Sequence, residues 1–314
     1  MWKRREAKRR RREGMLDSEA ARLTEQAMLL FYDADYEAAL PPIDRAVQLT
    51  TKAYGDQPRF DSDQYALGDR LRWRAETHQA LADPHSALRD ATRALALFEA
   101  QSSSRYPLLI PMVHVQLSLL HAVVGDAEGA RRHGESIEPF RESLASDGQG
   151  ALLAAKALAE YATAMWHIGE RDLGTAAARE SIAAYRSDLG SVFRRDSRIT
   201  FARIVYQLSL TLEPPDPRDA MEVLLMLQDV VEQLILVIPW SLTPFAEPRF
   251  RTHGVALLNT LERQGIWAAA LDEPELADRF RQLSQHLLEM PMRQWRPTME
   301  ESRALLESLR SRKG

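Results

Sequence analysis

The feature that most constrains the fold is a pattern of small residues that recurs every 43 to 57 residues along the 314-residue chain. One small residue follows each short break in an otherwise helical sequence: Ala39, Ala87, Ala130, Gly174, Ala220 and Ala277. Twelve positions before these stand Ala27, Ala75, Ser118, Ala162, Leu208 and Gly265, of which five are small. Small residues let two antiparallel helices approach closely. The pattern therefore predicts six consecutive helical hairpins.

The sequence between the breaks has helical rather than strand periodicity. Apolar residues recur at i, i+3, i+4 and i+7, for example in 22–30 and 87–97. The breaks are short and polar, as in DADY (33–36), ADPH (82–85) and GDAEG (125–129). A single hairpin of this kind cannot bury its apolar face alone, so its neighbours must cover it. We therefore expect an all-α repeat protein with one continuous core.

The same pattern resembles the tetratricopeptide repeat (TPR) family. The segments that carry the resemblance are DYEAALPPIDRAVQL (35–49), ADPHSALRDATRALAL (82–97) and VVGDAEGARRHGESI (123–137). The resemblance covers about residues 20–290 and is strongest in the first four units. It implies a right-handed superhelical solenoid of about six antiparallel helix hairpins that binds another protein or a peptide. The spacing between units exceeds the family's usual repeat length of about 34 residues. This longer spacing is similar to that of the bacterial kinesin-light-chain-like or regulator-associated branches.

The charge is distributed unevenly along the chain. The formal net charge is −4, but residues 1–14 contain eight basic residues against Glu6 and Glu13, so the other 300 residues carry −10. We predict a basic tail over 1–14, disordered or a helical extension, a repeat domain over 15–290 and a capping helix over 291–314. Phosphate neutralisation could bring the tail to nucleic acid. A solvated tail and translated sequence upstream of a start at Met15 are the alternatives. The basic side chains are Lys3, Arg4, Arg5, Lys8, Arg9, Arg10, Arg11 and Arg12.

Nothing in the sequence indicates catalysis. The chain has no cysteine, which excludes a thiolate zinc site and a cysteine nucleophile. It has no phosphate-binding loop, dinucleotide fingerprint, HExxH zinc motif or GxSxG nucleophile elbow. His114 and His121 share one helix face, but two turns separate them by roughly 10 Å, too far for one metal ion. We predict a chain without enzymatic activity, cofactor or metal.

The predicted docking surface is the concave face that the first helices of the hairpins line in such a solenoid. Aromatic side chains beside arginines and amides are typical of a recognition surface. The carboxylate clamp of the chaperone-tail TPR domains is not present, because Thr24, Met28, Arg72 and Glu76 occupy the matching positions. The candidate partner-binding residues are Phe31, Tyr32, Arg72, Trp73, Glu76, Gln79, Gln116, Lys156, Glu160, Trp166, His167, Tyr206 and Asn259.

The most apolar segment of the chain, 220–238, has two interpretations. It is either a solenoid helix covered by neighbours on both sides or a homo-oligomer contact. Charges interrupt it, which disfavours a bilayer span. The helix of 291–314 fits a terminal cap, with partner binding as the alternative.

The function that the sequence predicts is a non-catalytic protein- or peptide-binding scaffold in the bacterial cytoplasm. The alternative is a regulatory module in transcriptional control or signalling, with the basic tail contacting nucleic acid.

Overall fold

The structure is a computed structural model that describes residues 2–101, 108–145, 151–187, 195–213, 215, 217–236, 251–286 and 295–313. Side chains are described except in 2–12 and at a few helix ends. Within these ranges all regular elements are helices and no strand occurs, which confirms the predicted all-α fold. The chain forms two compact units, Met1–Ala177 and Ala178–Gly314, which are described separately below.

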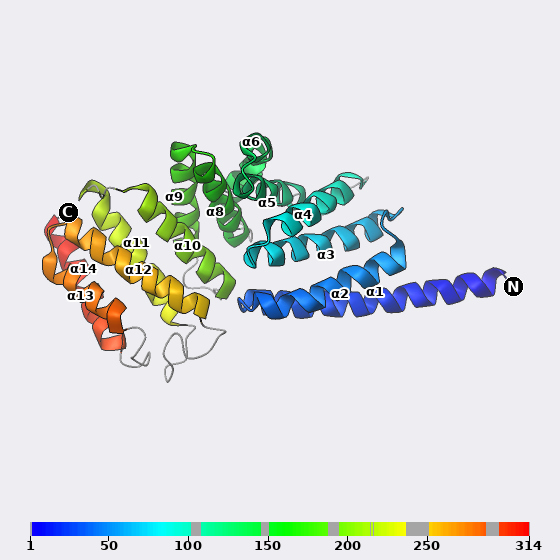
Figure 1. Ribbon diagram of the computed structural model, residues 1–314, viewed down its shortest axis with the longest axis horizontal. Helices are drawn as coiled ribbons and strands as arrows, with labels where there is room; N and C mark the ends of the chain where they lie inside the picture. The colour runs from blue at the N-terminus through cyan, green and yellow to red at the C-terminus, as the bar shows by residue number, and fades with distance from the viewer. Residues whose placement is uncertain are drawn as a thin grey trace. The chain divides into compact units, whose positions relative to one another are not determined.

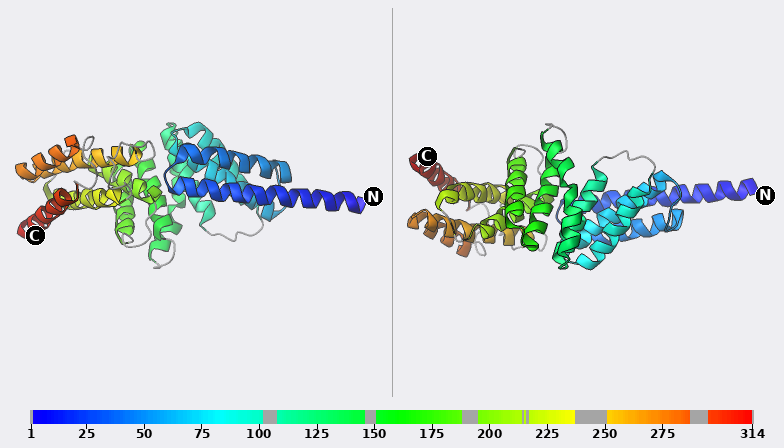
Figure 2. Two further views of the ribbon diagram at one scale, coloured as in Figure 1. Left: turned by 90° about the horizontal axis from the view of Figure 1, so that it is seen from below. Right: turned by 90° about the horizontal axis from the view of Figure 1, so that it is seen from above.

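Unit 1 is a series of helix hairpins. Each pair packs along its length, and the second helix of one pair contacts the first helix of the next. The views in Figures 1 and 2 show this order for the first four helices. The helices of unit 1 are α1 (Trp2–Tyr32), α2 (Tyr36–Tyr54), α3 (Asp61–Ala80), α4 (Pro84–Glu99), α5 (Leu109–Val123), α6 (Ala127–Gly134), the 3₁₀ turn η1 (Glu135–Ile137), α7 (Glu138–Ala145) and α8 (Ala151–His167). Helix α9 (Arg171–Ser187) includes the unit boundary.

The hairpin turns of unit 1 are built alike at the predicted breaks. In the first three, an aspartate caps the second helix by accepting a hydrogen bond from a backbone N–H three residues later, at Ala38, Ser86 and Gly129. The residue just before the aspartate has a left-handed backbone, with φ of 59° at Ala34, 59° at Ala82 and 86° at Gly125. The sequence breaks therefore mark the real helix ends.

The small residues of the repeat lie where the paired helices meet. Ala39, Ala75 and Ala87 are fully buried. In the third hairpin the Ser118 hydroxyl donates to the backbone carbonyl of Ala130, at 2.7 Å, which requires the two backbones to be close. The spacing of small residues thus predicts the contact lines of the hairpins correctly.

Helix α1 extends beyond α2 at its N-terminal end, and residues 2–14 belong to it (Figure 2). The side chains from Lys3 to Arg12 lie outside the described residues. The predicted contact with nucleic acid therefore stays a prediction.

Unit 2 consists of α10 (Arg195–Thr211), α11 (Pro217–Ile235), α12 (Arg251–Ala270), α13 (Pro274–His286) and α14 (Trp295–Lys313). Its core contains Phe201, Leu224, Leu227, Trp267 and Phe280, all fully buried.

The apolar segment predicted as a covered helix or an oligomer contact forms α11. Its apolar side chains from Val223 to Leu234, except the half-buried Leu225, are buried within the unit, where α11 packs against α10 and α12. Residues 237–238 lie outside the described residues. This burial favours the covered helix, and nothing in the described part of α11 supports a homo-oligomer.

The predicted cap corresponds to α14, which contacts α11. Leu306 and Leu309 are buried, and Arg303 donates to Glu232 of α11 at 3.0 Å. The capping role itself stays a prediction.

Candidate functional site

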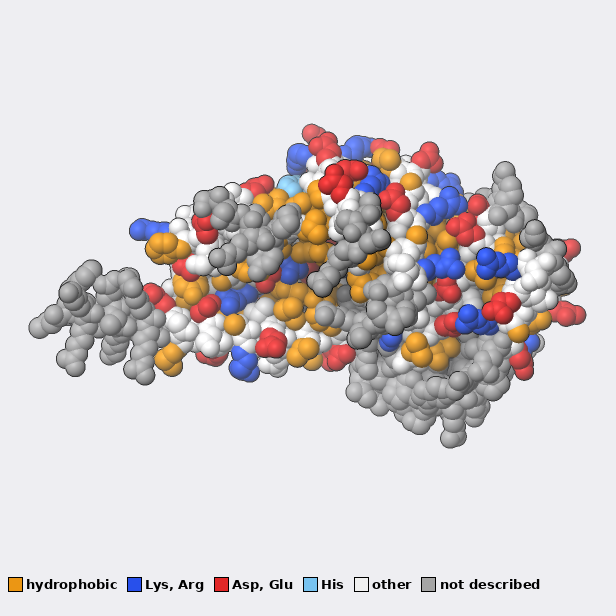
Figure 3. Space-filling model, turned by 180° about the vertical axis from the view of Figure 1, so that it is seen from behind, with side chains coloured by type: hydrophobic (Ala, Val, Ile, Leu, Met, Phe, Trp, Pro, Cys, Tyr) orange, Lys and Arg blue, Asp and Glu red, His pale blue; other side chains and the backbone are white. Residues whose placement is uncertain are grey.

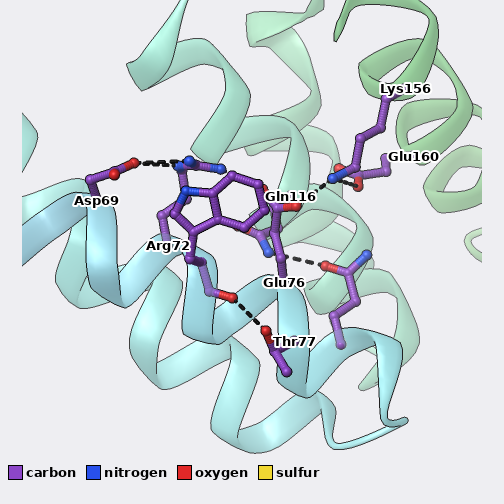
Figure 4. Close-up of polar contacts among 9 residues, drawn as sticks. Asp69, Arg72, Glu76, Thr77, Gln116, Lys156 and Glu160 are labelled. Carbon is purple, nitrogen blue, oxygen red and sulfur yellow. Dashed lines mark hydrogen bonds and ion pairs between the residues drawn. The ribbon is translucent and has the colours of Figure 1, made fainter. Parts of the chain in front are cut away.

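Many of the predicted docking residues meet in unit 1, around the carboxylate of Glu76. Arg72, one turn earlier on α3, donates to Glu76 Oε1 at 2.5 Å, and Lys156 of α8 donates to Oε2 at 2.5 Å. Glu160 lies 4.0 Å from the Lys156 ammonium. Side chains from α3, α5 and α8 thus converge on one network (Figure 4). The structure thus brings together Glu76 and Lys156, which are 80 residues apart in the sequence.

Glu76 is only 7% exposed, yet it remains a carboxylate. Burial by itself raises its pKa, but the charges of Lys156 and Arg72 outweigh this effect and lower the pKa below its usual range. Arg72 also donates to Asp69 at 2.8 Å, a partner that sequence reasoning missed although it lies three residues away on the same helix face. The charges on this face are therefore neutralised by one another.

Three aromatic rings continue this face toward α1. The centroid of Trp73 lies 5.6 Å from that of Phe31 and 5.5 Å from that of Tyr32, both in edge-to-face arrangements. The Arg72 guanidinium lies 4.5 Å from the centre of the Trp73 ring. Lys156 Nζ lies 5.6 Å from the centre of the Phe31 ring. Trp73 is 7% exposed and Phe31 4%, so these rings contribute to packing more than to a free surface.

A pair of amides completes the network. Gln116 of α5 donates from Nε2 to Gln79 Oε1 of α3 at 3.1 Å. Gln116 is itself buried. The structure thus brings these two candidates together, and their side chains bond to each other.

The remaining two candidates in unit 1 lie at the end of α8. The ring of Trp166 packs over Gly174, where an added Cβ would come within 2.5 Å of the indole, and its Nε1 donates to Thr175 at 3.5 Å. Trp166 therefore packs within its own hairpin. His167 is exposed at the last residue of α8.

Tyr206 and Asn259, the candidates in unit 2, line an open pocket between α10 and α12. Its volume is about 350 Å³. The lining positions follow helical spacing on each helix, so one face of α10 and one face of α12 form the walls. They are Ile199, Ala202, Arg203, Tyr206, Arg251, Thr252, Val255, Ala256 and Asn259.

The pocket combines an apolar floor with a basic rim. Ile199 and Ala202 are buried, whereas Arg203 and Arg251 are exposed. Sequence reasoning missed both arginines. Helical spacing could have identified them, because Arg203 lies three residues before Tyr206 and Arg251 lies eight residues before Asn259, which places each pair on one helix face.

The structure adds His133 of α6 to the two histidines of α5. Nδ1 of His114 lies 2.8 Å from Nδ1 of His133, so one ring carries the proton there and the other does not. The ring of His121 stacks on that of His133 at 5.2 Å and lies 2.8 Å from Asp126. Burial lowers the pKa of His133 to about 4, with His114, His121 and Arg132 adding to this effect. Across the described ranges, no group of three or more His, Asp or Glu side chains is arranged to hold a metal ion.

The face of the molecule drawn in Figure 3 shows no extended basic patch among the described residues. On the face in Figure 3, acidic and basic side chains are intermingled over the residues that the structure describes. No helix in the described ranges has the length and apolar character that crossing a membrane requires.

Comparison with known proteins identifies the fold. No protein-family model and no curated protein matches the chain. The fold is similar to the crystal structure of BtubC (BKLC) from P. vanneervenii, with a TM-score of 0.52 and 14% identity, over 80% of this chain and 90% of that one. The assembly chaperone of RpL4 (Acl4, residues 1–338) aligns over 94% of this chain and 99% of its own, at 18% identity and a TM-score of 0.33. The likeness to BtubC concerns the fold, which is a TPR-like helical repeat.

Proposed function

We propose that the chain is a non-catalytic scaffold that binds another protein through a peptide segment, and that the binding site is the pocket between α10 and α12. The observation that carries the proposal is the pocket itself, which lies between two helices predicted to line the docking face and contains two of the predicted residues, Tyr206 and Asn259. Clefts with apolar walls and a few polar groups are the usual form of a binding site.

The hydrogen bonding of the polar side chains favours the pocket over the face in unit 1 as the binding site. Neither the Tyr206 hydroxyl nor the Asn259 amide makes a side-chain hydrogen bond within the described residues, so both can bond to a partner. On the unit 1 face, Arg72 and Glu76 already bond to each other. As part of the same proposal we place the chain among the bacterial cytoplasmic TPR proteins with long unit spacing.

The experiment fills the pocket and compares recovered partners. The full chain, tagged, is used to isolate proteins from its native cells, alongside Ala256→Trp, which places an indole in the pocket. Ala269→Trp is the matched control, because Ala269 is exposed on α12 outside the pocket lining.

We expect one or more proteins to bind the wild type and Ala269→Trp but not Ala256→Trp, and the same dependence to hold with the purified partner. Equal recovery by all three chains would refute the proposal.

A further inference from the structure

The two exposed arginines of the pocket differ from the buried arginines Arg72 and Arg263. Arg72 is paired with Glu76, and Arg263 of α12 donates to Glu213 at 2.7 Å. Arg203 and Arg251 make no ion pair or hydrogen bond within the described residues. Two free guanidinium groups on one pocket rim provide unused positive charge.

The two helices that form the pocket each carry a net positive charge. Together α10 and α12 contain five arginines against two carboxylates, Asp196 and Glu262. Helix α11 contains one arginine against four carboxylates. The pocket's own helices thus carry a net charge of +3 together, although the chain beyond residue 14 carries −10. Such local complementarity selects partners and accelerates their association.

The floor of the pocket requires an apolar group. Ile199, Ala202 and Ala256 line it, and Val255 is 45% exposed at its edge. A side chain that covers these atoms removes apolar surface from water, which is favourable at about 25 cal/mol per Å². A purely polar acidic segment would leave the floor without a contact.

We infer that the pocket binds a peptide segment in which an aliphatic or aromatic side chain is flanked by carboxylates. The apolar side chain covers the floor, the flanking carboxylates meet Arg203 and Arg251, and Tyr206 and Asn259 bond to the peptide backbone. This inference rests on the proposed function and specifies its partner. A nucleic acid fits less well, because affinity for its backbone increases with the number of phosphates neutralised, and the pocket lining offers only two arginines.

The test uses fluorescein-labelled peptides of about ten residues, the length of a short docking segment. Their central residue is Leu, Phe or Ala, flanked on both sides by Glu, Gln or Lys in a Gly/Ser context. Binding to the full chain is measured by fluorescence polarisation at about 50 mM and about 500 mM NaCl, because exposed charge pairs are screened by salt. A single-stranded oligonucleotide of similar length and a lysine-flanked peptide serve as competitors.

We expect the Glu-flanked Leu or Phe peptides to bind, with about fivefold weaker binding at high salt. Arg203→Gln combined with Arg251→Gln weakens binding about tenfold. Arg22→Gln combined with Arg310→Gln, which removes the same charge at two exposed positions that do not line the pocket, leaves the affinity unchanged.

Other outcomes separate this inference from the proposed function. Equal affinity for Glu-, Gln- and Lys-flanked peptides, lost in Ala256→Trp, overturns the acidic partner and keeps the docking site. Stronger binding of the oligonucleotide than of any peptide overturns the peptide as occupant. Absence of binding by every peptide overturns the inference, and the recovery experiment with Ala256→Trp then decides the proposed function.

Discussion

The face of α3, α5 and α8 in unit 1 and the pocket of α10 and α12 in unit 2 are made from equivalent helices, but their side chains are used differently. In unit 1 the cations and the carboxylate of Glu76 bond to one another, and Trp73 and Phe31 are almost fully buried. In unit 2 Arg203 and Arg251 have no partner within the described residues, and a volume of about 350 Å³ lies beside them.

The difference shows that residue composition alone does not identify a binding surface. Aromatics, arginines and amides occur on both faces. A group that already has an internal partner must lose it before it can bind a ligand, and this cost offsets the new contact. The same residue types therefore stabilise the fold in unit 1 and remain free for a partner in unit 2.

The largest expected effect comes from replacing an aromatic residue on each face. Trp73→Ala should lower the free energy of unfolding by about 3 to 5 kcal/mol, because it leaves a cavity beside Phe31 and Tyr32. Tyr206→Ala should lower it by about 1 kcal/mol, since Tyr206 is only partly buried at an existing pocket. Urea denaturation followed by circular dichroism measures both. If Trp73→Ala left stability unchanged but weakened partner binding, the unit 1 face would be a binding surface and the contrast would fail.

The next largest effect concerns the charge of Glu76 on the unit 1 face. Glu76→Gln leaves the buried Arg72 and the half-buried Lys156 with a neutral partner, and losing one member of a buried ion pair costs about 3 kcal/mol. Asp69 and Glu160 keep the loss near the lower end of the usual range.

Hydrogen exchange at α3 and α8 locates this loss, and Glu25→Gln, at an exposed position of α1, is the control. Unchanged protection of both helices in Glu76→Gln would show that the network does not hold them together.

The smallest expected effect is a pH dependence in unit 1. The pKa of His133 is about 4 in the folded chain and about 6.5 in an unfolded one. Between these values the unfolded chain binds a proton that the folded chain excludes, so stability should fall as pH drops from about 6.5 to 4 and be flat above. His114 adds to the effect, because burial lowers its pKa despite Glu99 of α4, 3.8 Å away. Asp126, which pairs with His121, and Arg132 are the other charges beside the rings.

The urea midpoint, measured from pH 7.5 to 4.5, tests this. His133→Asn should flatten the pH dependence, and His85→Gln, at an exposed position, should retain it. An equally steep decline in His133→Asn would assign it to other groups.

The sequence was sufficient for the hairpins, because their determinants are local. Asp35 and Asp83 cap helices within three residues, and Ala39 and Ala87 mark contact lines by their spacing. The link from Glu76 to Lys156 and the stacking of His133 on His121 depend on how separate hairpins pack and where α6 begins. No periodicity encodes those pairings, so the sequence could not show which side chains bond to one another.

The ion pair between Glu76 and Lys156 has a consequence for cooperativity. In an ideal solenoid each hairpin contacts only its neighbours, and unfolding can start at either end and spread one repeat at a time. Glu76 belongs to the second hairpin and Lys156 to the fourth, so their bond skips the third. The second helix of the third hairpin is broken into α6, η1 and α7. The hairpins on either side of it are joined to each other by this ion pair. The third hairpin should therefore unfold together with its neighbours rather than before them.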